Sequence, residues 1–276
     1  MKAAGGPTGR GYGGFGMSAV DFTEFVAGLA TSSGQAILPF FRAKHTTEDK
    51  SAGGTFDPVT EADRAGEATM RNLIKRSFPE HGVLGEEFGS ENADADYVWV
   101  LDPIDGTRAF ISGIPVWGTL IGLTRKGVPV YGMMNQPFTG ERYSGDGRKA
   151  RYEGPGGPRE LHTRQTAALA EATLMTTSPH LFAGAEKQAY GRVESAVRLT
   201  RYGCDCYAYC MLAAGHVDLV IESGLKPYDI VALIPIIEGA GGIVTSWSGG
   251  SAAEGGTILA AGNKALHQAA LALLAG

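Results

Sequence analysis

The chain is short of cysteine, of long apolar runs and of excess positive charge, and each shortage excludes a class of protein. No apolar run approaches the roughly 20 residues of a membrane-spanning helix. The N-terminal residues MKAAGGPTGRGYGGFG lack the apolar segment of a secretory signal. The net charge is −5, from 24 basic and 29 acidic residues, which argues against a general nucleic-acid or anionic-membrane binder. We therefore expect a cytoplasmic protein without nucleic-acid or membrane partners.

The three cysteines, Cys204, Cys206 and Cys210, all lie in the short segment YGCDCYAYC. Because their number is odd and their spacing is close, we expect no disulfide framework, as is usual for a reducing compartment. A zinc site would need a fourth ligand, and His216 is the nearby candidate. We interpret the cysteines instead as small residues packed along a helix.

The apolar content is sufficient for a large core, with 276 residues of which 43% are hydrophobic. Residues 1–16 are rich in glycine and are predicted to be disordered. Residues 17–276 are predicted to form a single domain made of an α+β half, about 17–155, and an α/β half, about 156–276. The glycine- and proline-rich segment 154–158 is a plausible seam between the two halves.

Apolar spacing and turn residues predict a regular order of helices and strands. Helices are expected over residues 18–41, 60–78, 183–196, 204–214, 227–242 and 263–275, and a polar loop over 43–56. Strands are expected over residues 82–85, 97–101, 116–124, 128–135, 172–178, 198–203, 217–222 and 257–262. We expect these elements to stack as alternating α and β layers.

Five acidic residues stand where a strand ends or a helix begins. The stretch YVWVLDPIDGT, residues 97–107, leads an apolar strand into Asp102 and Asp105. Charge at the end of a core strand is costly to bury, so this pair favours a site over a simple turn. Glu86 follows another apolar run, and Asp63 and Asp229 lie in first turns of helices. Taken alone, each of these last two is better explained by the helix dipole than by a metal.

Carboxylates gathered without histidine or thiolate suit a hard cation such as Mg²⁺. Gly106 allows a ligand close to the backbone, and the helix start at Thr107 offers N–H groups to an anion. Four acids and a phosphate monoester together carry about six negative charges, which about three divalent ions would neutralise. The pattern therefore predicts a multi-metal phosphatase.

A competing class is the haloacid-dehalogenase phosphatases, which use D-x-D-G-T after an apolar strand. This chain has D-P-I-D-G-T, with one residue too many between the acids, and it contains no Asp-Asp pair for the later metal motif of that class. The spacing therefore disfavours this alternative.

The motifs GEE at 85–87, WVLDPIDGT at 99–107 and VTEAD at 59–63, with Asp229 downstream, resemble the inositol monophosphatase family over nearly the whole chain from Met17. The resemblance implies a layered αβαβα sandwich that works with two to three Mg²⁺ ions, for which Mn²⁺ can substitute. It also implies a homodimer. A non-catalytic binder on this fold would be expected to have lost at least one acid, and every acid position is filled.

The resemblance also implies a role for each site residue. The metal ligands would be Glu86, Asp102, the Ile104 carbonyl, Asp105 and Asp229. Gly106 and Thr107 would bind the phosphate through backbone N–H groups. Asp63 and Thr107 would orient the attacking water, Glu86 would share in catalysis, and Glu87 would be a neighbour of lesser role. Lys50 would contact the substrate from a covering loop, and the implied mechanism is in-line attack by a metal-bound hydroxide.

The substrate is predicted from finer differences within the family. Tyr228-Asp229 stands where inositol enzymes usually have Trp-Asp. Cys204-Asp205 stands where the inositol enzymes tend to have small uncharged residues. The chain therefore resembles the histidinol-phosphate phosphatases of the family more closely than the inositol enzymes. A carboxylate near the substrate ammonium gains a charge-assisted hydrogen bond, and Asp205 and Glu222 are available. Asp205 is explained equally well as a helix-start acid. We expect hydrolysis of the small-molecule ester L-histidinol phosphate in histidine biosynthesis. Inositol 1-phosphate or a broad set of sugar phosphates is the alternative.

Overall fold

The computed structural model describes residues 19–43, 47–49 and 58–276. The glycine-rich segment 1–16 and Lys50 lie outside the described residues. Among the helices that are described, none combines the length and the apolar character needed to cross a lipid bilayer.

The helices and strands alternate along most of the chain. The helices are α1 Ala19–Ile37, α2 Glu61–Ser77, α3 Thr107–Ile111, α4 Gly184–Glu194, α5 Asp205–Ala213, α6 Pro227–Ile230, α7 Leu233–Gly239 and α8 Lys264–Ala275. Short 3-10 turns cover Leu38–Phe40, Leu169–Glu171 and Pro179–Leu181. The strands are β1 Thr47–Asp49, β2 Pro58–Thr60, β3 Gly82–Gly85, β4 Gly89–Glu91, β5 Tyr97–Asp105, β6 Gly118–Arg125, β7 Val128–Gln136, β8 Glu141–Gly145, β9 Ala150–Glu153, β10 Arg159–Glu160, β11 Thr173–Thr176, β12 Leu199–Tyr202, β13 Leu219–Leu225, β14 Ile243–Ser246 and β15 Gly256–Ala261.

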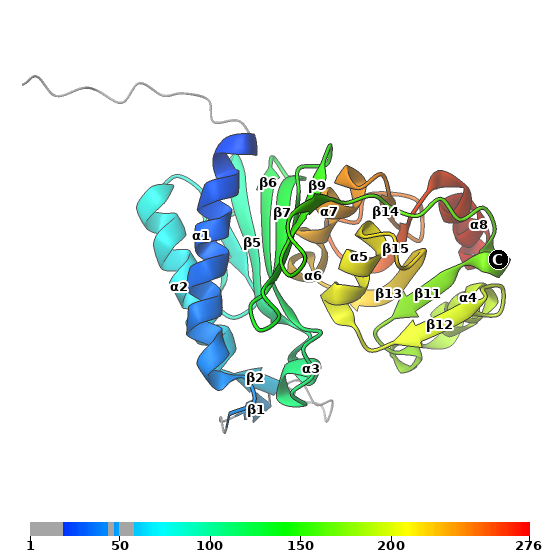
Figure 1. Ribbon diagram of the computed structural model, residues 1–276, viewed down its shortest axis with the longest axis horizontal. Helices are drawn as coiled ribbons and strands as arrows, with labels where there is room; N and C mark the ends of the chain where they lie inside the picture. Colours follow the sequence, from blue (N-terminus) through cyan, green and yellow to red (C-terminus); the bar gives the residue numbers. More distant parts are fainter. Residues whose placement is uncertain (1–18, 44–46, 50–57) are drawn as a thin grey trace, which may run out of the picture.

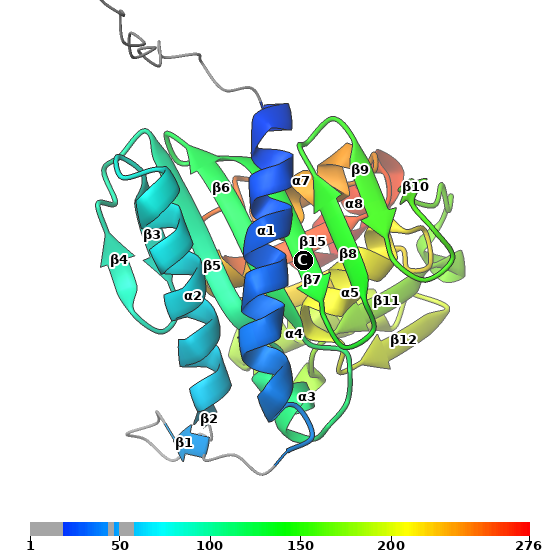
Figure 2. The same cartoon turned by 60° about the vertical axis from the view of Figure 1, so that its left-hand side comes forward.

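The layers alternate in type across the molecule (Figure 1). Helices α1 and α2 lie side by side on the outer face of the first sheet, where they contact β7 and β5 (Figure 2). Helices α5, α6 and α7 fill the space between the two sheets, and α4 and α8 cover the far face of the second sheet. This arrangement confirms the predicted αβαβα sandwich.

The two sheets differ in their topology. The first has the strand order β10-β9-β8-β7-β6-β5-β3-β4 and is antiparallel except where β3 runs parallel to β5. The second has the order β12-β11-β13-β15-β14, with parallel pairs around β11 and antiparallel pairs around β15. Strand β10 follows the segment 154–158 and still pairs with β9, so the chain leaves the first sheet only after Glu160.

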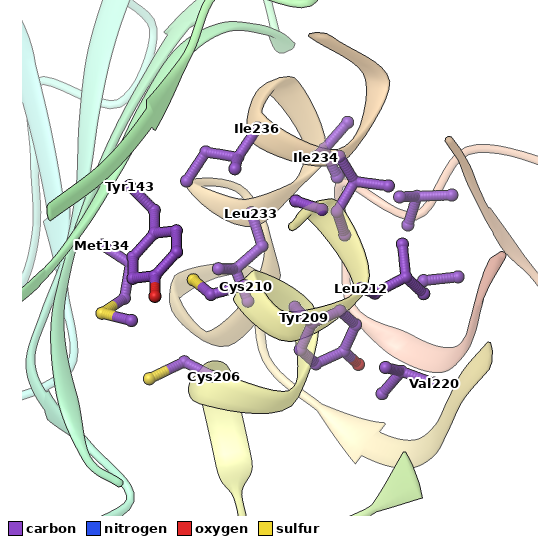
Figure 3. Close-up of a cluster of buried hydrophobic side chains, with 14 of the residues drawn as sticks. Met134, Tyr143, Cys206, Tyr209, Cys210, Leu212, Val220, Leu233, Ile234 and Ile236 are labelled. Carbon is purple, nitrogen blue, oxygen red and sulfur yellow. The ribbon is translucent and has the colours of Figure 1, made fainter. Parts of the chain in front are cut away.

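The central layer carries the largest buried cluster, in which α5 packs against both sheets (Figure 3). Cys206 and Cys210 of α5 lie near Met134 and Tyr143 of the first sheet, and Val220 of the second sheet lies on the other side. All three cysteines are free thiols, and Cys206 and Cys210 are buried. The interpretation of the cysteines as helix-packing residues is therefore confirmed for these two.

Strand β5 is longer than predicted, because it does not end at Leu101 but continues to Asp105. Its pairing with β6 becomes irregular between Asp102 and Asp105, where Pro103 has no N–H to donate. The Pro103 carbonyl instead accepts a hydrogen bond of 2.8 Å from the Thr119 hydroxyl. The two acids therefore belong to the strand itself and not to a turn after it.

The helix predicted over residues 227–242 is divided into α6 and α7. Pro235 cannot donate to the carbonyl of Val231, four residues earlier, so the helical ladder is interrupted at the point of division. Strand β14 then begins at Ile243, and it was missed in the sequence together with β1, β2, β4, β8, β9 and β10. Of these, β1 lies inside the segment 43–56 that was predicted to be a loop. Strands β4, β8, β9 and β10 are short and contain glycine or charged residues, which weakens the alternating apolar pattern, and β14 has only four residues.

Candidate active site

A cavity of about 310 Å³ opens where β5, α3, α5, α6 and β13 meet. It is lined by Glu86, Asp102, Ile104, Asp105, Gly106, Thr107, Arg108, Thr177, Leu181, Asp205, Cys206, Tyr209, Glu222, Gly224, Leu225, Lys226, Tyr228 and Asp229. All but two of the predicted site residues are in this set. Asp63 is not among the residues that line the described part of the cavity, and Lys50 lies outside the described residues.

Three carboxylates converge in the cavity. Asp102 and Asp105 come from β5 and Asp229 comes from α6, and one oxygen of each lies within 4.8 Å of the others. Burial raises the pKa of Asp102 well above its usual value, and the charges of Glu86, Asp105 and Asp229 raise it further. Oxygen Oδ1 of Asp102 is buried without a hydrogen-bond partner in the described structure. The cluster is therefore short of positive charge.

Backbone N–H groups orient the other two acids of the cluster. The N–H of Cys206 donates to Oδ2 of Asp105 at 2.6 Å, and the N–H of Lys226 donates to Oδ2 of Asp229 at 2.7 Å. Burial raises the pKa of Asp229 to about 6 even though the bond from Lys226 lowers it. The helix starts of α5 and α6 thus hold these carboxylates against their mutual repulsion.

Glu86 follows β3, and its place is set by β5. Its N–H donates to the carbonyl of Leu101 at 3.2 Å, one residue before Asp102, and its charge contributes to the raised pKa of Asp102. Its neighbour Glu87 has a buried side chain that forms an ion pair with Arg64 at 3.7 Å. The two glutamates therefore have different surroundings, and Glu86 alone of the pair lines the described cavity.

Gly106 and Thr107 form the sharp start of α3. Gly106 has φ of 90°, a left-handed conformation that favours glycine, and a Cβ there would meet Oδ2 of Asp205 at 3.2 Å. The hydroxyl of Thr107 donates to the carbonyl of Ile104 at 3.2 Å. Because the hydrogen of this hydroxyl points to the Ile104 carbonyl, the lone pairs of its oxygen remain available to accept a hydrogen bond from a molecule in the cavity.

Asp63 lies in the first turn of α2 and is only 2% exposed. Its charge is among those that raise the pKa of Asp102, so the two carboxylates are close enough to interact. The structure thus brings Asp63 toward the acid cluster, although from a different layer of the fold.

Two further acids lie on the side of the cavity formed by the second half of the chain. Asp205 begins α5 with φ of 42°, and burial raises its pKa while Arg108 and Thr177 lower it. Glu222 on β13 is 1% exposed and accepts hydrogen bonds from the Thr177 N–H at 2.6 Å and the Thr176 hydroxyl at 3.2 Å. Burial nevertheless raises the pKa of Glu222 to about 7.

Sequence reasoning missed several lining residues, of which Arg108, Thr177 and Tyr209 are the most informative. Arg108 directly follows the D-P-I-D-G-T motif, and this position was the available indication that it belongs to the site. Thr177 and Tyr209 lie in segments that read as ordinary strand and helix. The hydroxyl of Tyr209 is buried without a hydrogen-bond partner in the described residues.

The donor set fits a hard divalent cation. The converging side chains all offer oxygen, Asp102 retains an unsatisfied buried oxygen, and the surrounding acids share one small volume. Such a cluster favours ions like Mg²⁺ over Zn²⁺, which prefers nitrogen and sulfur. With cations bound, the cavity would attract an anionic ligand that the bare carboxylates would repel.

Sequence and structure comparisons with known proteins both indicate the family of this chain. The sequence profile of the inositol monophosphatase family matches residues 19–275. The chloroplastic bifunctional phosphatase IMPL2 of Arabidopsis thaliana is 47% identical over 255 residues, which cover 88% of this chain and 72% of that protein. The histidinol-phosphatase of Mycobacterium tuberculosis is 37% identical over 222 residues, which cover 79% and 84% of the two chains.

A solved structure agrees with these relatives. An inositol monophosphatase from Zymomonas mobilis superposes with a TM-score of 0.83 and 42% identity, over 94% of this chain and 100% of that one. The profile and the solved structure extend over nearly the whole length of this chain, and the two relatives match 88% and 79% of it. The chain therefore belongs to the inositol monophosphatase family and is a phosphatase of that family.

Proposed function

We propose that this protein is a Mg²⁺-dependent phosphate monoester hydrolase whose preferred substrate is L-histidinol phosphate. The observation that carries the metal dependence is the convergence of Asp102, Asp105 and Asp229, with the unsatisfied oxygen on Asp102. The observation that supports a cationic substrate is the second pair of acids, Asp205 and Glu222, in the same cavity.

The predicted site residues have distinct tasks in this proposal. Two to three Mg²⁺ ions would be held by Glu86, Asp102, Asp105, Asp229 and the carbonyl of Ile104. When bound, Mg²⁺ neutralises phosphate charge and lowers the pKa of a water molecule. The backbone N–H groups of Gly106 and Thr107 bind phosphate oxygens, and the hydroxyl of Thr107 accepts a hydrogen bond from the attacking water and so orients it. Asp63, whose charge acts on Asp102, would help Thr107 to orient this water.

The proposed substrate end of the cavity lies around Asp205 and Glu222. Histidinol carries an ammonium and an imidazole, both of which can donate to a carboxylate. Three relatives are named histidinol-phosphatases, from Mycobacterium tuberculosis, Chlorobaculum parvum and Streptomyces coelicolor, at 37%, 30% and 34% identity. In this chain the positive charge of Arg108 already acts on Asp205. A cationic group of the substrate would therefore have to displace Arg108 from Asp205 or share Asp205 with it.

A broader phosphatase is the second candidate, and specific observations favour it. The relative with 47% identity is named a bifunctional phosphatase, and the superposed structure with 42% identity is called an inositol monophosphatase. Arg108 and Tyr209 line the same cavity and offer hydrogen-bond donors that suit the hydroxyl groups of a polyol.

Phosphate release from a panel of esters tests the proposal. The panel contains L-histidinol phosphate, inositol 1-phosphate and glycerol 2-phosphate, each with EDTA, with added Mg²⁺ and with Mn²⁺. We expect activity to vanish with EDTA and to return with either metal, with the highest kcat/KM for histidinol phosphate. Full activity in metal-stripped protein would contradict the metal role, and a preference for inositol 1-phosphate would favour the second candidate.

A further inference from the structure

Glu67 is a fully buried acid on α2 that the catalytic scheme above does not use. Its Oε2 accepts a hydrogen bond from the N–H of Glu87 at 2.7 Å, and its Oε1 accepts one from the N–H of Phe88 at 3.2 Å. Oε1 also accepts from Nε of Arg71 at 2.7 Å. This carboxylate is thus satisfied by protein donors, in contrast to Asp102.

These bonds hold the backbone on one side of Glu86, while β5 holds it on the other. The N–H of Glu86 donates to Leu101 on β5, and the next two N–H groups donate to Glu67 on α2. Gly85 makes the approach possible, because a side chain at that position would overlap the Glu67 carboxylate. The peptide that carries Glu86 is therefore fixed from two separate layers.

The same face of α2 carries Asp63, one helical turn before Glu67, and Arg71, one turn after it. Arg71 is itself buried and donates to the carbonyl of Gly89, at the end of the same turn. One rigid helix therefore sets the position of Asp63 and of the turn between β3 and β4. A small rotation of α2 would move Asp63 and Glu86 together.

We propose that Glu67 is a positioning residue that aligns Glu86 for metal binding and couples it to Asp63. This proposal rests on the metal role of Glu86 given above. Glu67 is not among the residues lining the described part of the cavity, so it acts through the backbone of the turn. Partners that orient a ligand in this way typically change metal affinity by about 10- to 100-fold.

The test measures Mg²⁺ binding by calorimetry without substrate, so that activity is not the only readout. Glu67→Gln keeps the shape of the side chain but replaces one accepting oxygen with a donor group. We expect its Kd for Mg²⁺ to rise about tenfold or more. In steady-state assays its lost activity should be recovered by raising Mg²⁺, with KM for the ester unchanged.

Asp218→Asn is the matched control. Asp218 is likewise fully buried, accepts from an arginine, Arg164, and accepts from a backbone N–H, that of Thr173, but it lies outside the cavity. It should lower thermal stability and leave the Mg²⁺ Kd unchanged. If both variants shift the Kd equally, the effect of Glu67 is general destabilisation and the proposal is overturned.

Gly85→Ala leaves the Glu67 side chain unchanged, but its added methyl group would displace the Glu67 carboxylate. This variant therefore tests the position of Glu67 even if Glu67→Gln does not fold. It should also raise the Kd, and the double variant should be no worse than either single change, because both break the same contact. Wild-type protein that binds no Mg²⁺ would overturn the proposed function and this inference with it. Wild-type binding with unchanged Kd in both folded variants would overturn the inference alone.

Discussion

Asp102 and Asp218 are both buried carboxylates, at 2% and 0% exposure, yet their surroundings are opposite. Asp218 accepts hydrogen bonds from Arg164 at 2.9 Å, from the Thr166 hydroxyl at 2.5 Å and from the Thr173 N–H at 2.7 Å. Burial alone would raise the pKa of Asp218, but these donors outweigh it and leave the pKa lowered. Burial and like charges raise the pKa of Asp102 instead.

The difference shows how a buried acid with a structural role can be distinguished from one proposed to bind a metal ion. Around Asp218 the chain supplies the positive charge and the donors, so the ionised carboxylate is stabilised by the fold. Around Asp102 the described chain supplies further acids, so an ionised cluster needs cations from solution. Burial by itself does not separate the two cases, because it is the same in both.

The largest expected effect comes from replacing one carboxylate oxygen in Asp229, a member of the same acid cluster as Asp102, and in Asp218. Asp229→Asn keeps an oxygen for the Lys226 N–H but removes a charge from the cluster, so we expect kcat to fall by at least about 100-fold without loss of metal-free stability. Asp218→Asn leaves the partly exposed Arg164 without its counter-ion and should lower the free energy of unfolding by about 1–3 kcal/mol, with near-normal kcat in the folded fraction. Steady-state kinetics and urea unfolding measure both. Near-normal turnover by Asp229→Asn would remove it from the ligand set.

The surroundings of Asp205 are intermediate between those of Asp102 and Asp218. It has a cation nearby in Arg108, but burial still raises its pKa. Asp205→Asn should fold normally, because asparagine tolerates the left-handed φ of 42° at this position. If Asp205 binds the substrate ammonium, kcat/KM for L-histidinol phosphate should fall about 10- to 150-fold.

A neutral ester supplies the control for this variant. Glycerol 2-phosphate has no ammonium, so its kcat/KM should be almost unchanged by Asp205→Asn. Equal losses on the two esters would show that Asp205 stabilises the helix start and does not recognise the cation.

The smallest expected effect is the pH dependence of stability in metal-free protein. The folded-state pKa values of Asp229 and Glu222 are raised to about 6 and about 7, so the folded protein binds more protons than the unfolded chain between about pH 4 and 7. Stability in EDTA should therefore increase as the pH falls from 8 toward about 5. The lowered pKa of Asp218 acts in the opposite direction, and its contribution is lost only as the pH falls below about 4.

Thermal melts in EDTA and in Mg²⁺ measure this difference. Mg²⁺ binds the ionised carboxylates, so it should raise Tm most at pH 8 and least at pH 5. A metal-free Tm that is higher at pH 8 than at pH 5 would contradict a cluster of acids with raised pKa values.

Particular residues show how far sequence reasoning reaches. Asp102 and Asp105 were recognisable because two acids at the end of an apolar strand are unusual in a purely structural role. Asp229 was recognisable through its motif, and it also caps the start of α6, because it accepts a hydrogen bond from the Lys226 N–H. Glu67 was missed, although it shares the apolar stripe of α2 with Met70 and Ile74. A charge inside an apolar stripe was the available signal.

The sequence by itself determined the local properties of this protein: the positions of most helices and strands, the acid motifs and their hard-oxygen chemistry. These depend on residues within a few positions of one another, where spacing and turn chemistry act directly. Only the tertiary structure decided which acids are left without donors and which are paired. That outcome depends on contacts such as Cys206 with Asp105 and Glu67 with Glu87, which join segments far apart in the chain. The pKa of a carboxylate is set by burial and neighbouring charge, and both arise only when the layers pack together.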